Sequence, residues 1–406
     1  MGVPMPSEVK SSERQFEVQW DPHDPAEANT YPEVVAAIRE QCPVTWSTGR
    51  WSVHDSGFWL MTRYKDVRAA GLDWKLYSSA GGAAPLQFDL EVFRNGFLET
   101  DPPLHTKMRE AVTPFFLAPA LEQHEDGIRK IIDELIDEAV AASPVDFVET
   151  YALSLPSRIF FELFLHEDPE EIRFTIDIVR GLLKDMASAA ELAPKLQAWC
   201  AVAIQKRKDR GERDDMVGVI AHMGSDDFPV TDEMRIETLM LLIMAGMETT
   251  ANGLGAVIHT FATNPDARRE MANATPDQIT KAVDEFLRFS SPVPAAGRTL
   301  TEDTVVHGCP MKKGERVTLN WLSANHDPEV FPNPDVLDLS RNASQHLAFG
   351  VGYHKCLGMH LAKREMRLTI EALSKLRVFE LVPGAEINYR NGPARGLMSL
   401  PVICAR

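Results

Sequence analysis

One cysteine of the chain stands in a sequence context that favours metal binding. Residues 349–358 read FGVGYHKCLG, so Cys356 follows two glycines that allow a tight backbone turn. The apolar spacing that comes next predicts a helix over 359–373. Unpaired amides and the dipole at the start of such a helix favour a thiolate over a thiol. A thiolate held on a rigid loop is suited to bind iron.

Three other roles for Cys356 stay open on these residues alone. A lone cysteine is commonly a small buried hydrophobic residue. Cys356 could instead join His354 and His360 around zinc, although no second Cys/His cluster stands nearby. It could also be a thiol nucleophile activated by His354.

A second group of polar residues lies inside an apolar segment. Residues 232–264 form an unusually long helical pattern, and within it residues 244–250 read MAGMETT. A helix that is apolar on most faces must be buried, and Glu248, Thr249 and Thr250 are costly there unless they have a function. The alternative is that the hydroxyls bond carbonyls one turn earlier. Ala245 and Gly246 leave room for a flat ligand, and we expect a local bulge at that point.

The remaining patterns predict a mainly α fold with a small β region. We expect one domain over residues 31–406, preceded by a loosely attached polar arm at residues 1–30. Helices are predicted from Tyr31, after Pro103, around Ile128–Ile136 and over 154–164, 170–185 and 192–208. Short strands are predicted within 51–62, 297–317 and 379–404.

Composition excludes some classes of partner. The 406 residues include 59 acidic and 42 basic side chains, for a net charge of -17, which disfavours nucleic acid and anionic membranes. Five scattered cysteines fit a reducing compartment. The longest apolar run, Leu239–Met247, is too short to cross a bilayer. We therefore predict a soluble, cytoplasmic protein.

The motifs resemble those of the cytochrome P450 family. Residues 349–358 are similar to the family's haem-binding signature, Phe-Gly-x-Gly-x-His-x-Cys-x-Gly, with every fixed position present. Residues 245–249 are similar to its Ala-Gly-x-Asp/Glu-Thr motif. The resemblance implies the P450 fold, in which a long central helix lies over the haem and the Cys loop lies beneath it.

The resemblance also implies roles for individual residues. Cys356 is the implied iron ligand, and Glu248 and Thr249 are the implied catalytic residues that deliver protons to O2. The other implied cofactor-binding residues are His354, His105, Arg109, Arg298, Phe349 and Gly350. Glu285 and Arg288, one helical turn apart, would form a structural charge network with Arg341.

The implied activity is that of a haem b monooxygenase. It would insert one oxygen atom from O2 into an apolar small molecule by hydroxylation, epoxidation or dealkylation. Electrons would come from NAD(P)H through an external ferredoxin, or a flavodoxin-type donor, and its reductase. The predicted docking patch consists of Lys107, Lys355, Lys363, Arg364 and Arg367. The alternative is that these are scattered, solvated charges. The predicted pocket residues are Phe93, Phe97, Met244, Ala245, Met247, Val293, Ala295, Leu397 and Met398. Arg94 would seat a substrate carboxylate or pair with Asp89 or Glu91.

Three rival functions belong to other classes. The first is a haem enzyme driven by peroxide, or a haem isomerase or dehydratase, in which Glu248 and Thr249 would have no proton to deliver. The second is a haem protein that stores or senses a gas, and the third is a zinc-binding or structural helical protein.

Overall fold

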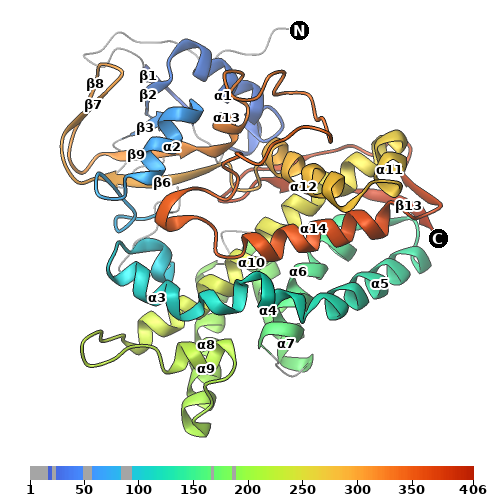
Figure 1. Ribbon diagram of the computed structural model, residues 1–406, viewed down its shortest axis with the longest axis horizontal. Helices are drawn as coiled ribbons and strands as arrows, with labels where there is room; N and C mark the ends of the chain where they lie inside the picture. The colour runs from blue at the N-terminus through green and yellow to red at the C-terminus, as the bar shows by residue number, and fades with distance from the viewer. Residues whose placement is uncertain (1–16, 21–23, 49–56, 84–93, 166–168, 185–188) are drawn as a thin grey trace.

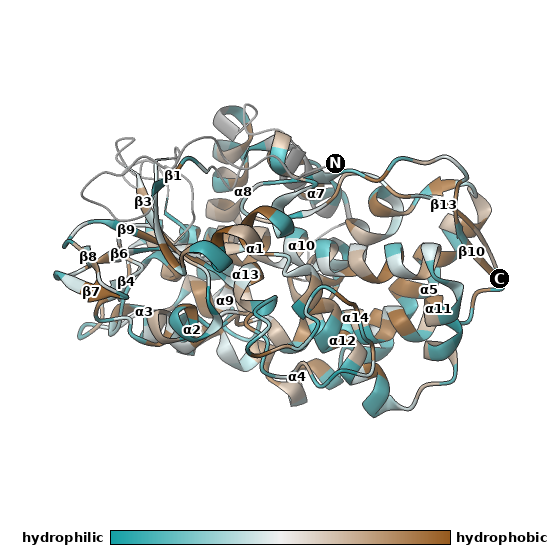
Figure 2. Ribbon diagram, turned by 90° about the horizontal axis from the view of Figure 1, so that it is seen from above, coloured by the Kyte–Doolittle hydropathy of each residue, from teal (hydrophilic) through white to brown (hydrophobic). Residues whose placement is uncertain are grey.

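The computed structural model describes residues 17–20, 24–48, 57–83, 94–165, 169–184 and 189–406. A six-stranded sheet lies at one end of the molecule and a smaller sheet lies at the other, with most helices between them (Figures 1 and 2). This arrangement confirms the predicted mainly α fold with a small β region.

The helices follow the periodic apolar segments of the sequence. Their bounds are α1 (Tyr31–Gln41), α2 (Tyr64–Leu72), α3 (Leu104–Val112), α4 (Ala118–Glu122), α5 (Glu125–Ala141), α6 (Ser154–Arg158), α7 (Pro169–Lys184), α8 (Ala189–Arg210), α9 (Met216–Ala221), α10 (Asp232–Thr263), α11 (Pro265–Ala272), α12 (Pro276–Ser290), α13 (Trp321–Asn325) and α14 (Met359–Leu373). Short 3-10 turns are η1 (Pro25–Glu27), η3 (Gly96–Glu99), η4 (Thr113–Phe116) and η8 (Gly352–His354), and π turns are η5 (Val148–Ala152) and η6 (Ile159–Leu165). The predicted helix over 154–164 is therefore an α turn followed by a π turn.

The strands form four sheets among the described residues. The six-stranded sheet has the order β1-β2-β3-β9-β6-β4, and the three-stranded sheet has the order β10-β13-β5. Two hairpins, β7-β8 and β11-β12, complete the set. The bounds are β1 (Glu17–Val18), β2 (Val44–Ser47), β3 (Phe58–Met61), β4 (Tyr77–Ser78), β5 (Val145–Asp146), β6 (Ala295–Leu300), β7 (Thr304–Val306), β8 (Cys309–Met311), β9 (Arg316–Asn320), β10 (Val378–Leu381), β11 (Tyr389–Arg390), β12 (Gly396–Leu397) and β13 (Pro401–Ala405).

Helix α10 runs through the middle of the molecule. It begins at the N-cap Thr231, whose hydroxyl accepts the Met234 amide (3.2 Å), and ends before Pro265. The helix is long and apolar enough to cross a membrane, yet 67% of its most apolar 18-residue window is buried inside the protein. The predicted burial is confirmed, because α10 packs against helices and strands from most of the chain. The predicted bulge is wrong, since the helix stays α-helical over its whole length.

The N-terminal segment is more closely attached than we predicted. Strand β1 pairs in parallel with β2, and Trp20 is 1% exposed. The Trp20 ring lies edge-on to the Tyr31 ring, with 5.4 Å between the ring centroids. The backbone carbonyl of Trp20 accepts a hydrogen bond of 2.7 Å from the Ser47 hydroxyl. The described part of the predicted arm therefore belongs to the packed structure, because a buried indole holds it there.

Replacing Trp20 with alanine tests this attachment. Loss of a fully buried tryptophan should lower the free energy of unfolding by about 3–5 kcal/mol, measured by denaturant titration. The control is Phe174→Ala, because the Phe174 side chain on α7 is 51% exposed. That change should stay within about 0.5 kcal/mol of the parent protein. Equal effects of the two substitutions would show that the segment adds no stability.

Candidate active site

Glycines and backbone hydrogen bonds shape the loop before Cys356. Gly350 and Gly352 have φ values of 65° and 75°, which side chains rarely adopt. A Cβ on Gly352 would lie 2.6 Å from the Gly71 carbonyl oxygen at the end of α2. The Cys356 amide donates to the Phe349 carbonyl at 2.8 Å. The loop is thereby held against α2 with Cys356 at its end.

The Cys356 sulfur faces the start of α14. The amides of Gly358 and Met359 donate to it, and the positive charges of Arg109 and Lys355 act in the same direction, lowering the thiol pKa. Desolvation by the surrounding protein is the larger effect and raises the pKa. The side chain is nevertheless exposed, whereas the four other cysteines are buried. A desolvated thiol with an uncovered face is placed to bind a ligand rather than to fill the core.

Two histidines meet beside this loop without hydrogen-bond partners. The His105 and His354 rings are 4.3 Å apart, and all four ring nitrogens are buried and unpartnered among the described residues. Burial is the main cause that lowers the pKa of His105 to about 4 and that of His354 to about 2. Both rings are therefore neutral at pH 7, and each keeps one N–H donor without an acceptor.

Two arginines add positive charge at the same place. Arg298 on β6 is 5% exposed, and its guanidinium donates to the Gly297 carbonyl at 2.6 Å. Burial and the neighbouring Arg316 lower its pKa to about 10. Arg298 and Arg109 both act on His354, and burial also lowers the pKa of Arg109. Asp101 is a carboxylate whose charge acts on both Arg298 and His105.

The combination fits a haem. Haem presents an iron atom to the thiolate and two carboxylates to the donors, and arginine binds carboxylates bidentately. Unpartnered buried donors are rare in folded proteins, and a bound carboxylate would satisfy them. Among the described residues no three His, Cys, Asp or Glu side chains converge on one point, so the zinc alternative lacks a ligand set there.

Helix α10 contributes a second polar face. The Thr249 hydroxyl donates to the Ala245 carbonyl at 2.9 Å, and Ala245 is exposed although much of the helix is buried. Burial raises the pKa of the Glu248 carboxyl to about 7. A Cβ on Gly253 would lie 3.3 Å from the Met366 sulfur, so α10 runs close to α14 one turn beyond Thr249.

Comparison with known proteins identifies the family. A family model described as Cytochrome P450 matches residues 203–401. The vitamin D(3) 25-hydroxylase of Pseudonocardia autotrophica is 32% identical over 377 residues, which are 90% of this chain and 92% of that protein. The chain belongs to the cytochrome P450 family.

Further similarities agree with this identification of a P450. The mycinamicin IV hydroxylase/epoxidase of Micromonospora griseorubida is 30% identical over 85% of this chain and 89% of its own. The solved structure of the Bacillus subtilis P450 PksS superposes with a TM-score of 0.83 at 26% identity, covering 96% of this chain and 100% of that chain. The P450 fold predicted from sequence is confirmed, and this P450 is a haem-dependent monooxygenase that incorporates oxygen from O2.

The charge network predicted for this P450 comes together in the structure. Glu285 and Arg288 are fully buried and joined by two hydrogen bonds of 2.7 and 2.9 Å. Arg341 lies 3.1 Å from the same carboxylate, and Arg288 also donates to the Asn325 carbonyl at 2.9 Å. The network ties α12 to the chain segments that lead toward the Cys loop.

The predicted pocket residues differ in exposure. Ala245 is exposed and Met244 is half-buried on α10, whereas Met247 is 2% exposed and packs in the main core. Met247 therefore points away from the uncovered face of α10. Phe97 is buried and lies edge-on to His105 at 5.9 Å. Val293 is half-buried, Ala295 and Leu397 are buried, Met398 is 63% exposed, and Phe93 lies outside the described residues.

The position of Arg94 bears on the expected salt bridge. Its guanidinium donates to the Glu99 carbonyl at 3.4 Å, and its charge acts on Glu237 of α10. Asp89 and Glu91, its predicted partners, lie outside the described residues. Arg94 is therefore near the N-terminal half of α10.

Three residues of the predicted docking patch form ion pairs with acidic side chains. The sequence pattern gave no indication of these partners. Lys363 lies 2.6 Å from Asp284, Arg364 lies 2.8 Å from Glu125, and Arg367 contacts both Glu125 and Glu371. Lys107 and Lys355 remain exposed. Three of the five residues are thus paired within the protein, and the docking role of the patch stays a prediction.

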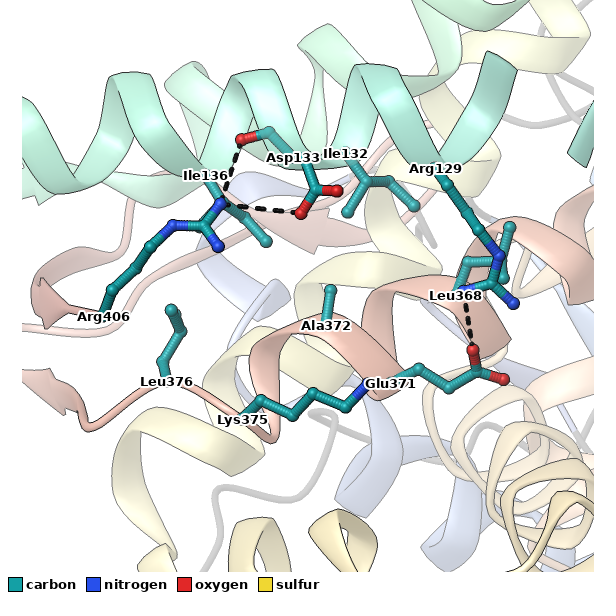
Figure 3. A pocket seen from close by; sticks show the side chains of 10 residues that line it. All are labelled: Arg129, Ile132, Asp133, Ile136, Leu368, Glu371, Ala372, Lys375, Leu376 and Arg406. Carbon is teal, nitrogen blue, oxygen red and sulfur yellow. Dashed lines mark hydrogen bonds and ion pairs between the residues drawn. The ribbon is translucent and has the colours of Figure 1, made fainter. Parts of the chain in front are cut away.

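A surface cleft between α5 and α14 lies apart from the haem-binding residues (Figure 3). Its volume is about 240 Å³, and its apolar floor includes Ile132, Ile136 and Leu368. Ion pairs line the rim, among them Arg129 with Glu371 at 2.9 Å. Leu368 is ten residues beyond Gly358, which is about 15 Å along a helix. The cleft therefore belongs to the outer surface and not to the site.

Loss of Arg288 should destabilise the protein strongly. Arg288→Ala leaves the buried Glu285 carboxylate uncompensated, which should lower the free energy of unfolding by about 3–5 kcal/mol in a denaturant titration. Arg269→Ala is the matched control, because Arg269 also pairs with an acid three residues earlier but is exposed. That substitution should cost about 1 kcal/mol or less. Similar losses for both would contradict a buried network.

Proposed function

We propose that this P450 holds haem b through Cys356 and inserts one oxygen atom from O2 into an apolar small molecule. The reaction would be a hydroxylation, epoxidation or dealkylation. The observation that carries the proposal is the exposed thiol before α14, beside the buried His105 and His354 rings, whose nitrogens have no hydrogen-bond partner among the described residues. His105, His354, Arg109 and Arg298 would bind the two haem carboxylates.

On the thiol side, burial raises the pKa of Cys356, and neighbouring groups would offset this rise for the thiolate that binds iron. The amides of Gly358 and Met359 and the charge of Arg109 favour the anion against desolvation. The Phe349 carbonyl accepts the Cys356 amide, which fixes the backbone that carries the proposed ligand. When bound, the haem supplies the oxidising chemistry, and the protein supplies the ligand, the proton path and a site that excludes water.

On the α10 side the protein would deliver protons. The Thr249 hydroxyl gives its hydrogen to the Ala245 carbonyl, so its oxygen lone pairs are directed to accept a hydrogen bond from a water molecule. Glu248 directly precedes Thr249. Because burial raises the pKa of its carboxyl to about 7, Glu248 can both take up and release a proton near neutral pH. We assign Glu248 the proton supply and Thr249 the positioning of the water.

Electrons would come from NAD(P)H through an external ferredoxin, or a flavodoxin-type donor, and its reductase. The exposed Lys107 and Lys355 supply positive charge near the Cys loop for an acidic donor. Glu285, Arg288 and Arg341 have a supporting role, since they fix α12 against the segment that leads to the loop.

The substrate would be an apolar molecule of medium size. Phe97, Met244 and Ala245 offer apolar surface near the proposed haem site. Relatives named for vitamin D(3), mycinamicin IV and linalool support this class. We infer a cytoplasmic location, because α10, the membrane-length helix found among the described residues, is mostly buried within the protein.

Replacing Cys356 with serine should remove the thiolate ligand. The reduced, carbon-monoxide-bound protein should lose the red-shifted Soret band that a thiolate-bound haem gives, and product formation should stop. Cys42→Ser is the matched control: the Cys42 thiol donates to the Val44 carbonyl at 2.9 Å, and a serine keeps that donor. An unchanged spectrum and continued hydroxylation in Cys356→Ser would overturn the proposal.

Proton supply by Glu248 predicts a characteristic pH dependence. Because the acid loses its proton as the pH rises through about 7, product formed per NAD(P)H consumed should decline above that pH. Glu248→Gln should lower product formation by about 10²-fold and abolish this decline. Product and peroxide are measured together over a pH series. If Glu248→Gln keeps the pH profile of the parent enzyme, the peroxide-driven alternative is favoured. The same holds if hydrogen peroxide alone gives product at the rate of the electron-supplied reaction.

A further inference from the structure

The Glu248 carboxylate has a partner that no sequence motif indicates. The Arg390 guanidinium on β11 lies 2.8 Å from it, and the two side chains are 25% and 13% exposed, respectively. Arg390 is the more exposed of the pair, so it stands on the solvent side of the carboxylate. We propose that Arg390 is a positioning residue that keeps Glu248 able to exchange protons. This inference rests on the proposed function, which gives Glu248 its role.

The hairpin that carries Arg390 is seated directly on α10. In the β11-β12 ladder, Arg390 is opposite Gly396. Gly396 lies so close to the Asn252 side chain that it has no room for a Cβ. Asn252 is one turn beyond Glu248 and therefore on the same face of the helix. The glycine allows the close approach that brings the Arg390 side chain within reach of Glu248.

The outer side of the same hairpin is fastened to the N-terminal segment. The Tyr389 amide donates to the Asn29 side chain at 2.9 Å, and Arg395 donates to the Ala28 carbonyl at 3.0 Å. The Arg395 guanidinium also lies over the Tyr389 ring at 4.1 Å. With one side on α10 and the other on residues 28–29, the hairpin gives Arg390 a rigid base. A surface ion pair between two mobile side chains would lack this support.

Two opposing influences act on the Glu248 carboxyl. Burial raises its pKa, and Arg390, the charged group whose field acts on it among the described residues, lowers it. Without Arg390 only the desolvation would remain, and the acid would hold its proton through the neutral range. A relay group must release its proton as well as take one up, and it does so best when its pKa is near the working pH. Arg390 is thus suited to maintain that balance.

An infrared titration of the holoenzyme tests the inference without measuring turnover. The carboxylic acid C=O band of Glu248 is the band that is lost in Glu248→Gln. In Arg390→Met its titration midpoint should rise by about one to three pH units, because the opposite charge is gone. Arg390→Lys keeps the charge and should hold the midpoint near that of the parent enzyme. An unchanged midpoint in Arg390→Met would overturn the inference.

A double-variant comparison separates this inference from the proposed function. Arg390→Met alone should increase the peroxide released per NAD(P)H, whereas it should add nothing in a Glu248→Gln background. If Glu248→Gln itself leaves coupling unchanged, the proposed proton supply fails. If Glu248→Gln uncouples the enzyme but Arg390→Met acts equally in both backgrounds, the role of Arg390 fails. The carbon monoxide spectrum confirms in each variant that the haem site is intact.

Discussion

At the Cys356 sulfur, burial opposes the nearby amides and positive charges, and the proposed haem site depends on this opposition. Desolvation disfavours the Cys356 thiolate, so other groups must compensate. The compensation comes from the first amides of α14, from Arg109 on α3 and from the glycine loop that orients the thiol. These contributions come from separate segments, so the site exists only when the whole chain has folded.

The groups beside the sulfur are hydrogen-bond donors and a cation, which favour a bound anion. His105, His354 and Arg298 come from α3, the Cys loop and β6, and the protein itself gives them few acceptors. The proposed haem would bring two carboxylates to these donors, and a ligand that binds only the folded state stabilises it. The buried pair of Glu285 and Arg288 shows the contrast, because there both charges are supplied by the chain and the network is closed. The proposed haem site and the Glu285–Arg288 network thus differ in whether the chain itself supplies both charges.

On helix α10, two opposing influences act on the Glu248 carboxyl. Glu248 is neither fully exposed nor paired in a dry core, and burial and Arg390 act on it in opposite directions. The balance depends on a hairpin near the end of the sequence and on residues 28–29 near its beginning. The proposed chemistry at the centre of the molecule is therefore coupled to segments that are distant in sequence.

Local spacing was enough to determine the chemistry-bearing motifs and most elements. The glycines before Cys356, the helix after it and the long apolar pattern of α10 are short-range features, because backbone conformation and helix periodicity depend on neighbouring residues. Even the family could be recognised from two short segments. Thr249 and its hydrogen bond to Ala245 also follow from residues within one turn.

Only the tertiary structure decided which distant groups neutralise one another. Arg390 pairs with Glu248, and Asp284 and Glu125 pair with cations that the sequence suggested for docking. It also decided that Trp20 is buried and that Met247 turns into the core. The physical reason is that ion pairs and packing depend on three-dimensional proximity, and a charge in the sequence carries no signal of the partner that folding will bring to it.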